Sequence, residues 1–125
     1  MKKEDANQIE DRLIDLAVSI IALPGRLPET YAGRHVAQQV LRSGTAPAPN
    51  YGEARGAESR ADFVHKLGLA LKELNESQIW LKIIGRASLA DRGAREPVLG
   101  ECVQLCRIVN ASIQTARRNA MNDDR

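Results

Sequence analysis

The sequence predicts an all-α protein, an antiparallel up-down-up-down four-helix bundle in a single domain spanning residues 1–125. Hydrophobic residues make up 43% of the chain but aromatic residues only 3%, so the core must be aliphatic. The chain is rich in Ala, Leu, Ile, Arg and Glu, which favour helices, whereas sheets rely on β-branched and aromatic residues. Apolar residues recur every three or four positions in four segments, as one helix face requires. Both ends, about 1–5 and 120–125, are expected to fray.

The first helix is expected from about Asp5 to Leu23. Its apolar residues step by four, three, four and three positions, the spacing of a bundle seam: Ile9, Leu13, Leu16, Ile20 and Leu23. Ala17 and Ile21 widen this stripe. Pro24-Gly25 then ends or bends the helix, because both residues interrupt regular helical structure.

Proline interrupts the second helix, which is expected from about Glu29 to Arg42. Its apolar stripe is weaker and consists of Ala32, Val36 and Val40. Pro47 and Pro49 have no amide hydrogen to donate, and each costs an uninterrupted helix about 3 kcal/mol. The helix therefore either stops near Ser43 and restarts around Asn50, or continues with a kink near Pro47.

Ser59 and Asp62 predict the start of the third helix, because the hydroxyl accepts from a first-turn amide and the carboxylate lies near the positive end of the dipole. The helix is expected to run to about Arg86, and Asp62 and Lys66 are spaced for an ion pair. Its core stripe is Val64, Leu67, Leu71, Leu74 and Leu81.

A loop is expected over 87–95, after which Glu96-Pro97 opens the fourth helix, because proline suits a first turn. The seam of this helix is Leu99, Cys102, Cys106, Val109, Ile113 and Ala116. We expect Leu13, Leu16, Leu67, Leu71, Val109 and Ile113 to be buried in the finished bundle.

The residues that most often carry catalysis or bind metals are few and scattered. Cys102 and Cys106 lie four apart on the fourth helix, as half of a metal site or as core residues; on an apolar seam, free cysteine packs as a small hydrophobe. The two histidines, His35 and His65, fall on different predicted helices. No glycine-rich phosphate loop is present. The sequence therefore predicts no catalytic residue, metal or cofactor, and gives an enzyme no positive support.

Several blocks of sequence carry a family resemblance: 41–47, 50–54, 59–67, 70–77, Trp80-Leu81 and 112–117. In order and spacing they resemble the signature of small four-helix-bundle proteins first noticed as products of intervening sequences in bacterial 23S ribosomal RNA. The resemblance implies a long, bent second helix reaching about Arg55. It also implies a ring-like homopentamer. Some similar proteins are accessory factors to reverse transcriptases of diversity-generating retroelements, where a basic surface contacts nucleic acid and the enzyme.

A polar group lies at the expected bend: Ser43, Asn50 and Glu53. Backbone groups around a proline kink lose partners and need side chains or water. Ser43 and Asn50 suit that role, and Arg42 could reach Glu53. The group either stabilises the bend or forms part of a surface for a protein or nucleic-acid partner.

An apolar patch lies outside the seam of the third helix: Ile79, Trp80 and Ile83. Exposed patches of this kind mark interaction surfaces, and tryptophan is enriched among interface anchors. Either the loop 87–95 covers the patch or it meets another subunit. A ring uses heterologous contacts, so the complement is an outer face of the first or second helix, where Val18 or Leu41 offers apolar contact.

Four arginines lie on or beside the second helix: Arg34, Arg42, Arg55 and Arg60. The net charge is only +2 and the pI about 8.7, so a solvated charged face accounts for them. In a ring, however, symmetry repeats the cluster and could form a basic band that binds RNA or DNA.

The chain shows no signal-peptide pattern and no apolar run approaching a membrane span, so we expect a cytoplasmic protein without a membrane partner. The sequence and the resemblance together predict a non-catalytic homo-oligomeric scaffold that binds nucleic acid or a protein partner. The alternative is a purely structural protein–protein oligomer that does not bind nucleic acid.

Overall fold

A computed structural model of the chain describes residues 2–123, and these are almost entirely helical. They form five α-helices and one short 3-10 helix: α1 (Lys3–Ala22), η1 (Pro24–Arg26), α2 (Tyr31–Thr45), α3 (Pro47–Arg55), α4 (Arg60–Arg86) and α5 (Arg92–Asp123). The all-α prediction is confirmed. None of these helices has an apolar stretch long enough to cross a bilayer.

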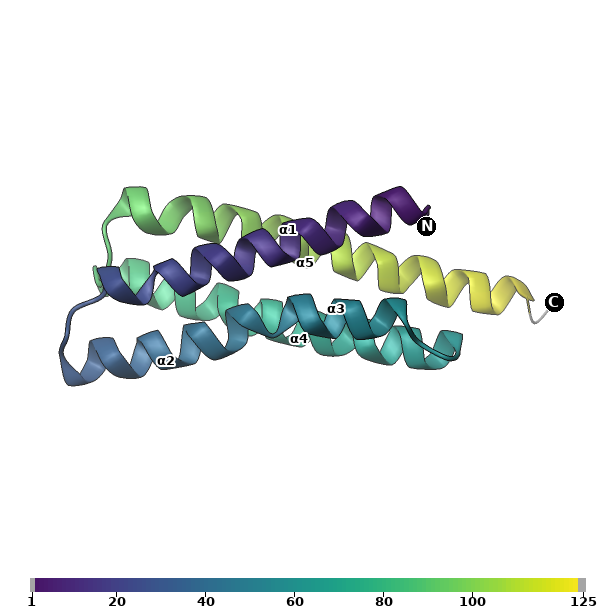
Figure 1. Ribbon diagram of the computed structural model, residues 1–125, viewed down its shortest axis with the longest axis horizontal. Coiled ribbons are helices and arrows are strands. Elements are labelled where there is room, and N and C mark those ends of the chain that lie inside the picture. Colours follow the sequence, from purple (N-terminus) through teal and green to yellow (C-terminus); the bar gives the residue numbers. More distant parts are fainter. Residues whose placement is uncertain (1, 124–125) are drawn as a thin grey trace.

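The helices α2 and α3 act together as the second helix of a four-helix bundle and run in line beside α4 (Figure 1). Only Ala46 separates them, and its backbone is itself helical, with φ −77° and ψ −35°. The amide of Asn50 donates to the carbonyl of Ala46 at 3.1 Å, so helical bonding resumes directly after Pro47. The bent second helix reaching Arg55, implied by the family resemblance, is therefore confirmed.

Helices α1 and α4 lie at opposite corners of the bundle. Both α1 and α4 pack against α2, α3 and α5, and α4 makes its most extensive contacts with α5. The start of α1 and the end of α5 lie at one end of the bundle, together with the turn between α3 and α4 (Figure 1). The connections from α1 to α2 and from α4 to α5 lie at the other end. We call that second end, residues 23–34 and 82–97, the loop end.

Helix α4 begins where the sequence predicts. Ser59 is its N-cap, and its hydroxyl accepts a hydrogen bond from the amide of Asp62 at 3.0 Å. Helix α2 uses the same device, since the Thr30 hydroxyl accepts from the amide of Gly33 at 3.0 Å. Each cap satisfies an amide that has no partner within its own helix.

The predicted start of the fourth helix at Glu96-Pro97 is wrong, because α5 already begins at Arg92. Asp91 caps it, and its carboxylate accepts from the amide of Ala94 at 2.9 Å. Pro97 lies inside the second turn, where it removes a single backbone hydrogen bond from a helix of 32 residues. The loop is therefore 87–91 rather than 87–95. At the two ends, α1 and α5 extend into residues 3–5 and 120–123, where we expected fraying.

The core is aliphatic, as the composition predicts, with one fully buried aromatic ring, Tyr51. Of the six residues expected to be buried, Leu71 is the exception, since it is only half-buried. The buried stripe of α4 passes beside it, through Leu67, Ala70, Leu74, Ser77, Leu81 and Ile84. Helices α1 and α2 approach closely at Gly44, where a Cβ atom would lie 2.7 Å from the side chain of Ile20.

Candidate functional site

Ser43, one member of the polar group at the bend, connects α2 to α4. Ser43 is fully buried, and the Ser77 hydroxyl donates to the Ser43 hydroxyl at 2.9 Å. The Ser77 hydroxyl is also 2.9 Å from the carbonyl oxygen of Glu73, one turn earlier in α4. Two buried hydroxyls thus satisfy one another across the helix–helix contact, which is the condition for burying polar groups without penalty.

The expected contact between Arg42 and Glu53 is not formed. Arg42 instead donates from both terminal nitrogens to α4, to the carboxylate of Glu73 at 3.1 Å and to that of Glu76. Glu53 accepts from Lys66 at 3.2 Å, which joins α3 to α4 in place of the expected Asp62–Lys66 pair. The predicted polar residues therefore split, with Ser43 in the core and Glu53 on the surface.

Glu76 connects Arg42 to the only tryptophan of the chain. Its carboxylate accepts from the indole nitrogen of Trp80 at 3.1 Å as well as from Arg42. These two hydrogen bonds, that from Trp80 first, hold the pKa of Glu76 below its ordinary value. The Trp80 ring meets His35 of α2 edge to face, with ring centroids 6.0 Å apart. Trp80 is therefore half-buried in the contact between α2 and α4.

The neighbours of Trp80 point outward. Ile79 is 55% exposed and Ile83 38% exposed, so the loop 87–91 does not cover them. On the opposite corner of the bundle, α1 exposes a row of apolar side chains at i, i+4 and i+7: Ile14, Val18 and Ile21. We call this row the α1 stripe. Val18, predicted as a complement to the patch, is 59% exposed, and Leu41 of α2 is also exposed.

The α1 stripe corrects one prediction, and it adds Ile14 and Ile21 to Val18, the residue already predicted on this surface. Ile21, expected to widen the core stripe, is 59% exposed. The sequence pattern contains the signal for this surface, because Ile14, Val18 and Ile21 lie on one helical face that the core residues do not use.

The four predicted phosphate-binding arginines are spread along the molecule. Arg34 lies at the loop end, where it donates to the carbonyl of Glu29 at 3.0 Å, and Arg42 lies midway. Arg55 and Arg60 lie at the opposite end, where Arg55 pairs with Glu10 at 3.3 Å. The structure therefore brings together only Arg55 and Arg60, and ion pairs already neutralise Arg42 and Arg55.

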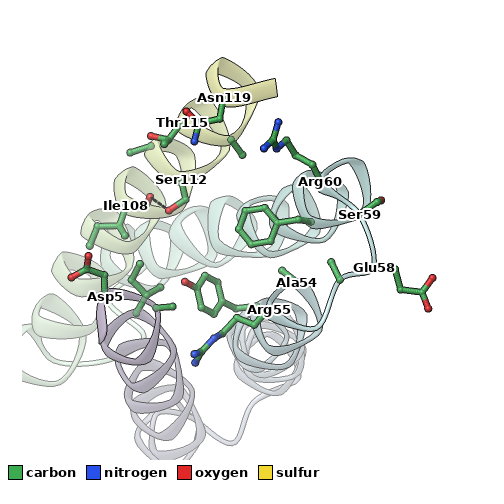
Figure 2. A pocket seen from close by; sticks show the side chains of 17 residues that line it. Asp5, Ala54, Arg55, Glu58, Ser59, Arg60, Ile108, Ser112, Thr115 and Asn119 are labelled. Atoms are coloured by element: carbon green, nitrogen blue, oxygen red, sulfur yellow. Dashed lines mark hydrogen bonds between the residues drawn. The ribbon is translucent and has the colours of Figure 1, made fainter. Parts of the chain in front are cut away.

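Arg55 and Arg60 border a groove that the sequence does not predict (Figure 2). It has a volume of about 940 Å³ and lies between the start of α1, the turn from α3 to α4, and the second half of α5. Its lining includes the ring of Tyr51, whose pKa is raised by burial, and the half-buried Phe63.

The ionisable groups of this groove do not converge. Asp5 and Glu58 lie on opposite sides of it, and Arg60 extends toward Asn119 of α5 (Figure 2). The side chain of Arg55 is tied to Asn7 at 2.8 Å and to Glu10. A general acid and base would have to lie within reach of the same substrate atoms, which this arrangement does not provide.

The cysteines pack in the core. Cys102 is buried, with its sulfur 3.4 Å from the carbonyl oxygen of Leu74, and the Cys106 sulfur is 3.5 Å from the side-chain oxygen of Gln78. Contact with the Cys106 thiol and burial raise the pKa of Cys102. Within residues 2–123, no three His, Cys, Asp or Glu side chains are grouped as a metal ion would require.

Comparison with known proteins identifies a family and a solved structure of similar fold. The model of a protein family described as 23S rRNA-intervening sequence protein matches residues 5–111. A crystal structure of a protein of unknown function from the S23 ribosomal protein family of Bacteroides thetaiotaomicron VPI-5482 is 33% identical, with a TM-score of 0.80. The similarity covers 87% of this chain and 97% of that one. No curated protein matches the chain.

Proposed function

The chain belongs to the 23S rRNA-intervening sequence protein family, and from this membership and its surfaces we propose that it is a non-catalytic, self-assembling scaffold that binds nucleic acid. The observation that carries the proposal is the pair of exposed apolar surfaces on diagonally opposed helices. One is the α1 stripe, and the other consists of Ile79 and Ile83 on α4. Exposed side chains of this size, gathered on single helix faces, are typical of protein interfaces.

The diagonal placement favours head-to-tail association. A subunit that presents the α1 stripe at one corner and the α4 pair at the other can join two neighbours at once, one through each surface. Such heterologous contacts close into a ring when the rotation from one subunit to the next is a whole fraction of a full turn. We propose a ring-like homo-oligomer, with five subunits as the family resemblance implies.

Light scattering on the purified chain tests the assembly. We expect an oligomer for the natural sequence and a smaller species for Ile79→Glu, because a carboxylate at this interface would lose its water without gaining a partner. Ile79 is a better probe than Trp80, since Trp80→Glu would also disturb its contacts with Glu76 and His35 inside the subunit.

Met121→Glu is the matched control for this experiment. Met121 is exposed on α5, away from both proposed surfaces, so the same change there should leave the oligomer intact. A monomeric natural chain would refute the assembly, and an intact oligomer for Ile79→Glu would refute this interface alone.

The nucleic-acid half of the proposal rests on the family resemblance and on the basic side chains. Binding should be electrostatic and should weaken steeply as salt rises, because each phosphate contact releases condensed counterions. Mobility shifts at low salt with RNA and with DNA test it. If neither binds, the remaining function is the alternative, a structural protein–protein oligomer in the cytoplasm, where Cys102 and Cys106 stay reduced.

A further inference from the structure

Positive charge is concentrated at the loop end of the bundle. Residues 23–34 and 82–97 contain six Lys or Arg side chains against three carboxylates, a net charge of +3. The whole chain carries only +2, so the rest of the molecule is close to neutral. The loop end is therefore a positively charged surface that the fold creates from segments about fifty residues apart in sequence.

The cations of the loop end are available to a ligand. Five of them are exposed and make no ion pair within the part of the chain that the structure describes: Arg26, Arg34, Lys82, Arg86 and Arg92. This sets them apart from Arg42 and Arg55, which would have to release a carboxylate before binding phosphate.

Two hollows open on the loop end, and one of them joins its two segments. One, of about 360 Å³, is lined by Arg26 of η1 together with Asp91 and Gly93 at the start of α5. The other, of about 370 Å³, lies between Pro24 and Leu41 of α2, and Arg34 is part of its lining. The loop end is thus an indented surface, and Arg26 and Arg34 line its hollows.

An exposed aromatic ring lies on the same surface. Tyr31, the first residue of α2, is 85% exposed, whereas Tyr51 is buried and Phe63 and Trp80 are half-buried. Because Tyr31 is exposed to water on the same surface as the arginines of the loop end, its ring offers a flat face on which an unpaired base stacks. A base can stack on this ring while the cations contact the phosphates, which favours a nucleic acid over an anionic membrane or an acidic protein as the ligand.

We infer that the loop end binds single-stranded nucleic acid, with its five unpaired cations contacting the phosphates and Tyr31 stacking on a base. The inference rests on the proposed function and locates its nucleic-acid site. In a cyclic assembly, equivalent residues lie at the same height along the axis, so all loop ends lie at one level of the ring. One strand could then contact several subunits, which raises the overall affinity without any new contact.

Fluorescence anisotropy with a labelled oligonucleotide, single-stranded or paired with its complement, tests the inference. The triple variant Arg26→Gln/Arg86→Gln/Arg92→Gln should weaken single-strand binding at least about tenfold at low salt and flatten the log–log salt slope by about 2. Tyr31→Ala should weaken single-strand binding about five- to tenfold and spare the duplex, whereas Tyr31→Phe keeps the stacking face and should bind normally.

The control is Arg107→Gln/Arg117→Gln/Arg118→Gln, which removes the same charge from exposed positions of α5 outside the loop end. Equal losses in the two triple variants, or none in the first, would refute this site while leaving nucleic-acid binding in place. If the natural chain binds no oligonucleotide, or binds only phosphatidylserine vesicles, the nucleic-acid half of the proposed function fails as well.

Discussion

Ser77 contributes to the packing of α4 in a way that the apolar pattern does not reveal. It occupies a position of the buried stripe between Leu74 and Leu81, where the periodicity leaves a gap, and it is fully buried. A serine at such a place needs partners inside the protein, and besides the Glu73 carbonyl one turn earlier it contacts Ser43, 34 positions earlier in the chain. That distance explains why sequence reasoning could identify Ser43 as a polar residue of the bend but could not identify its contact.

The hydroxyl pair makes a stability prediction. Ser77→Ala should lower the free energy of unfolding by about 1 kcal/mol, because Ser43 loses a buried hydrogen-bond partner. The double variant Ser43→Ala/Ser77→Ala should cost less than the sum of the two single variants, since it leaves no hydroxyl unsatisfied. Urea denaturation of the four proteins measures this difference, and strictly additive losses would contradict the coupling.

Glu76 makes a prediction about pH. Its pKa is lowered in the folded protein by the hydrogen bonds from Trp80 and Arg42, so its carboxylate stabilises the fold at pH values above the ordinary carboxyl range of about 4.3. This contribution is lost as the pH falls through the lowered pKa. The stability difference between the natural chain and Glu76→Gln should therefore be present near neutral pH and shrink in acid. A stability difference between the two proteins that does not change with pH would contradict this role of the Glu76 carboxylate.

Among the elements, α4 was the most predictable and the start of α5 the least. Helix α4 has a long apolar period and a serine cap, two local signals that agree. At α5 they disagree, because Pro97 suggests a helix start, whereas the helix is capped by Asp91, six residues earlier. Ile21 shows a different limit: it lies on the same helical face as Ile14 and Val18, but an apolar residue on that face does not by itself reveal whether the finished bundle buries it.

Helix α4 also allows a test of its buried face. Leu74→Ala should destabilise the protein by about 2–5 kcal/mol, because Leu74 is fully buried and its truncation leaves a cavity. Leu71→Ala, three residues earlier, should cost clearly less, because Leu71 is only half-buried. Chemical denaturation of both variants compares the two positions directly, and a larger loss at Leu71 would mean that the helix is rotated.

The cap of α5 is testable on its own. Asp91→Ala should cost about 1 kcal/mol, because the amide of Ala94 loses the carboxylate that satisfies it. Asp91→Asn should retain most of the stability, since an asparagine oxygen accepts the same bond. Thermal unfolding of the two variants separates the loss of the capping hydrogen bond from the loss of the negative charge. Equal losses of stability in the two variants would argue against the capping role.

For the whole molecule, the sequence and the family resemblance predicted the bundle, the bent second helix and the family. They did not predict where charge accumulates, because the loop end joins residues 23–34 to residues 82–97 only after the chain has folded. The same holds for Arg42, whose partners Glu73 and Glu76 lie more than 30 residues away. Local patterns identify which residues are polar, while the fold decides which of them remain unpaired.

The head-to-tail arrangement makes a prediction that a symmetric contact does not. Val18→Glu disables the α1 stripe but keeps the α4 surface, and Ile79→Glu does the reverse, so each variant alone should be a monomer. Mixed in equal amounts, they retain one intact pair of complementary surfaces and should form a one-to-one dimer that grows no further. If Ile79 met its own copy across a twofold axis, Val18→Glu would assemble normally and mixing would add nothing. Light scattering on the two variants and their mixture distinguishes these arrangements, and a full-sized oligomer in the mixture would contradict the head-to-tail arrangement.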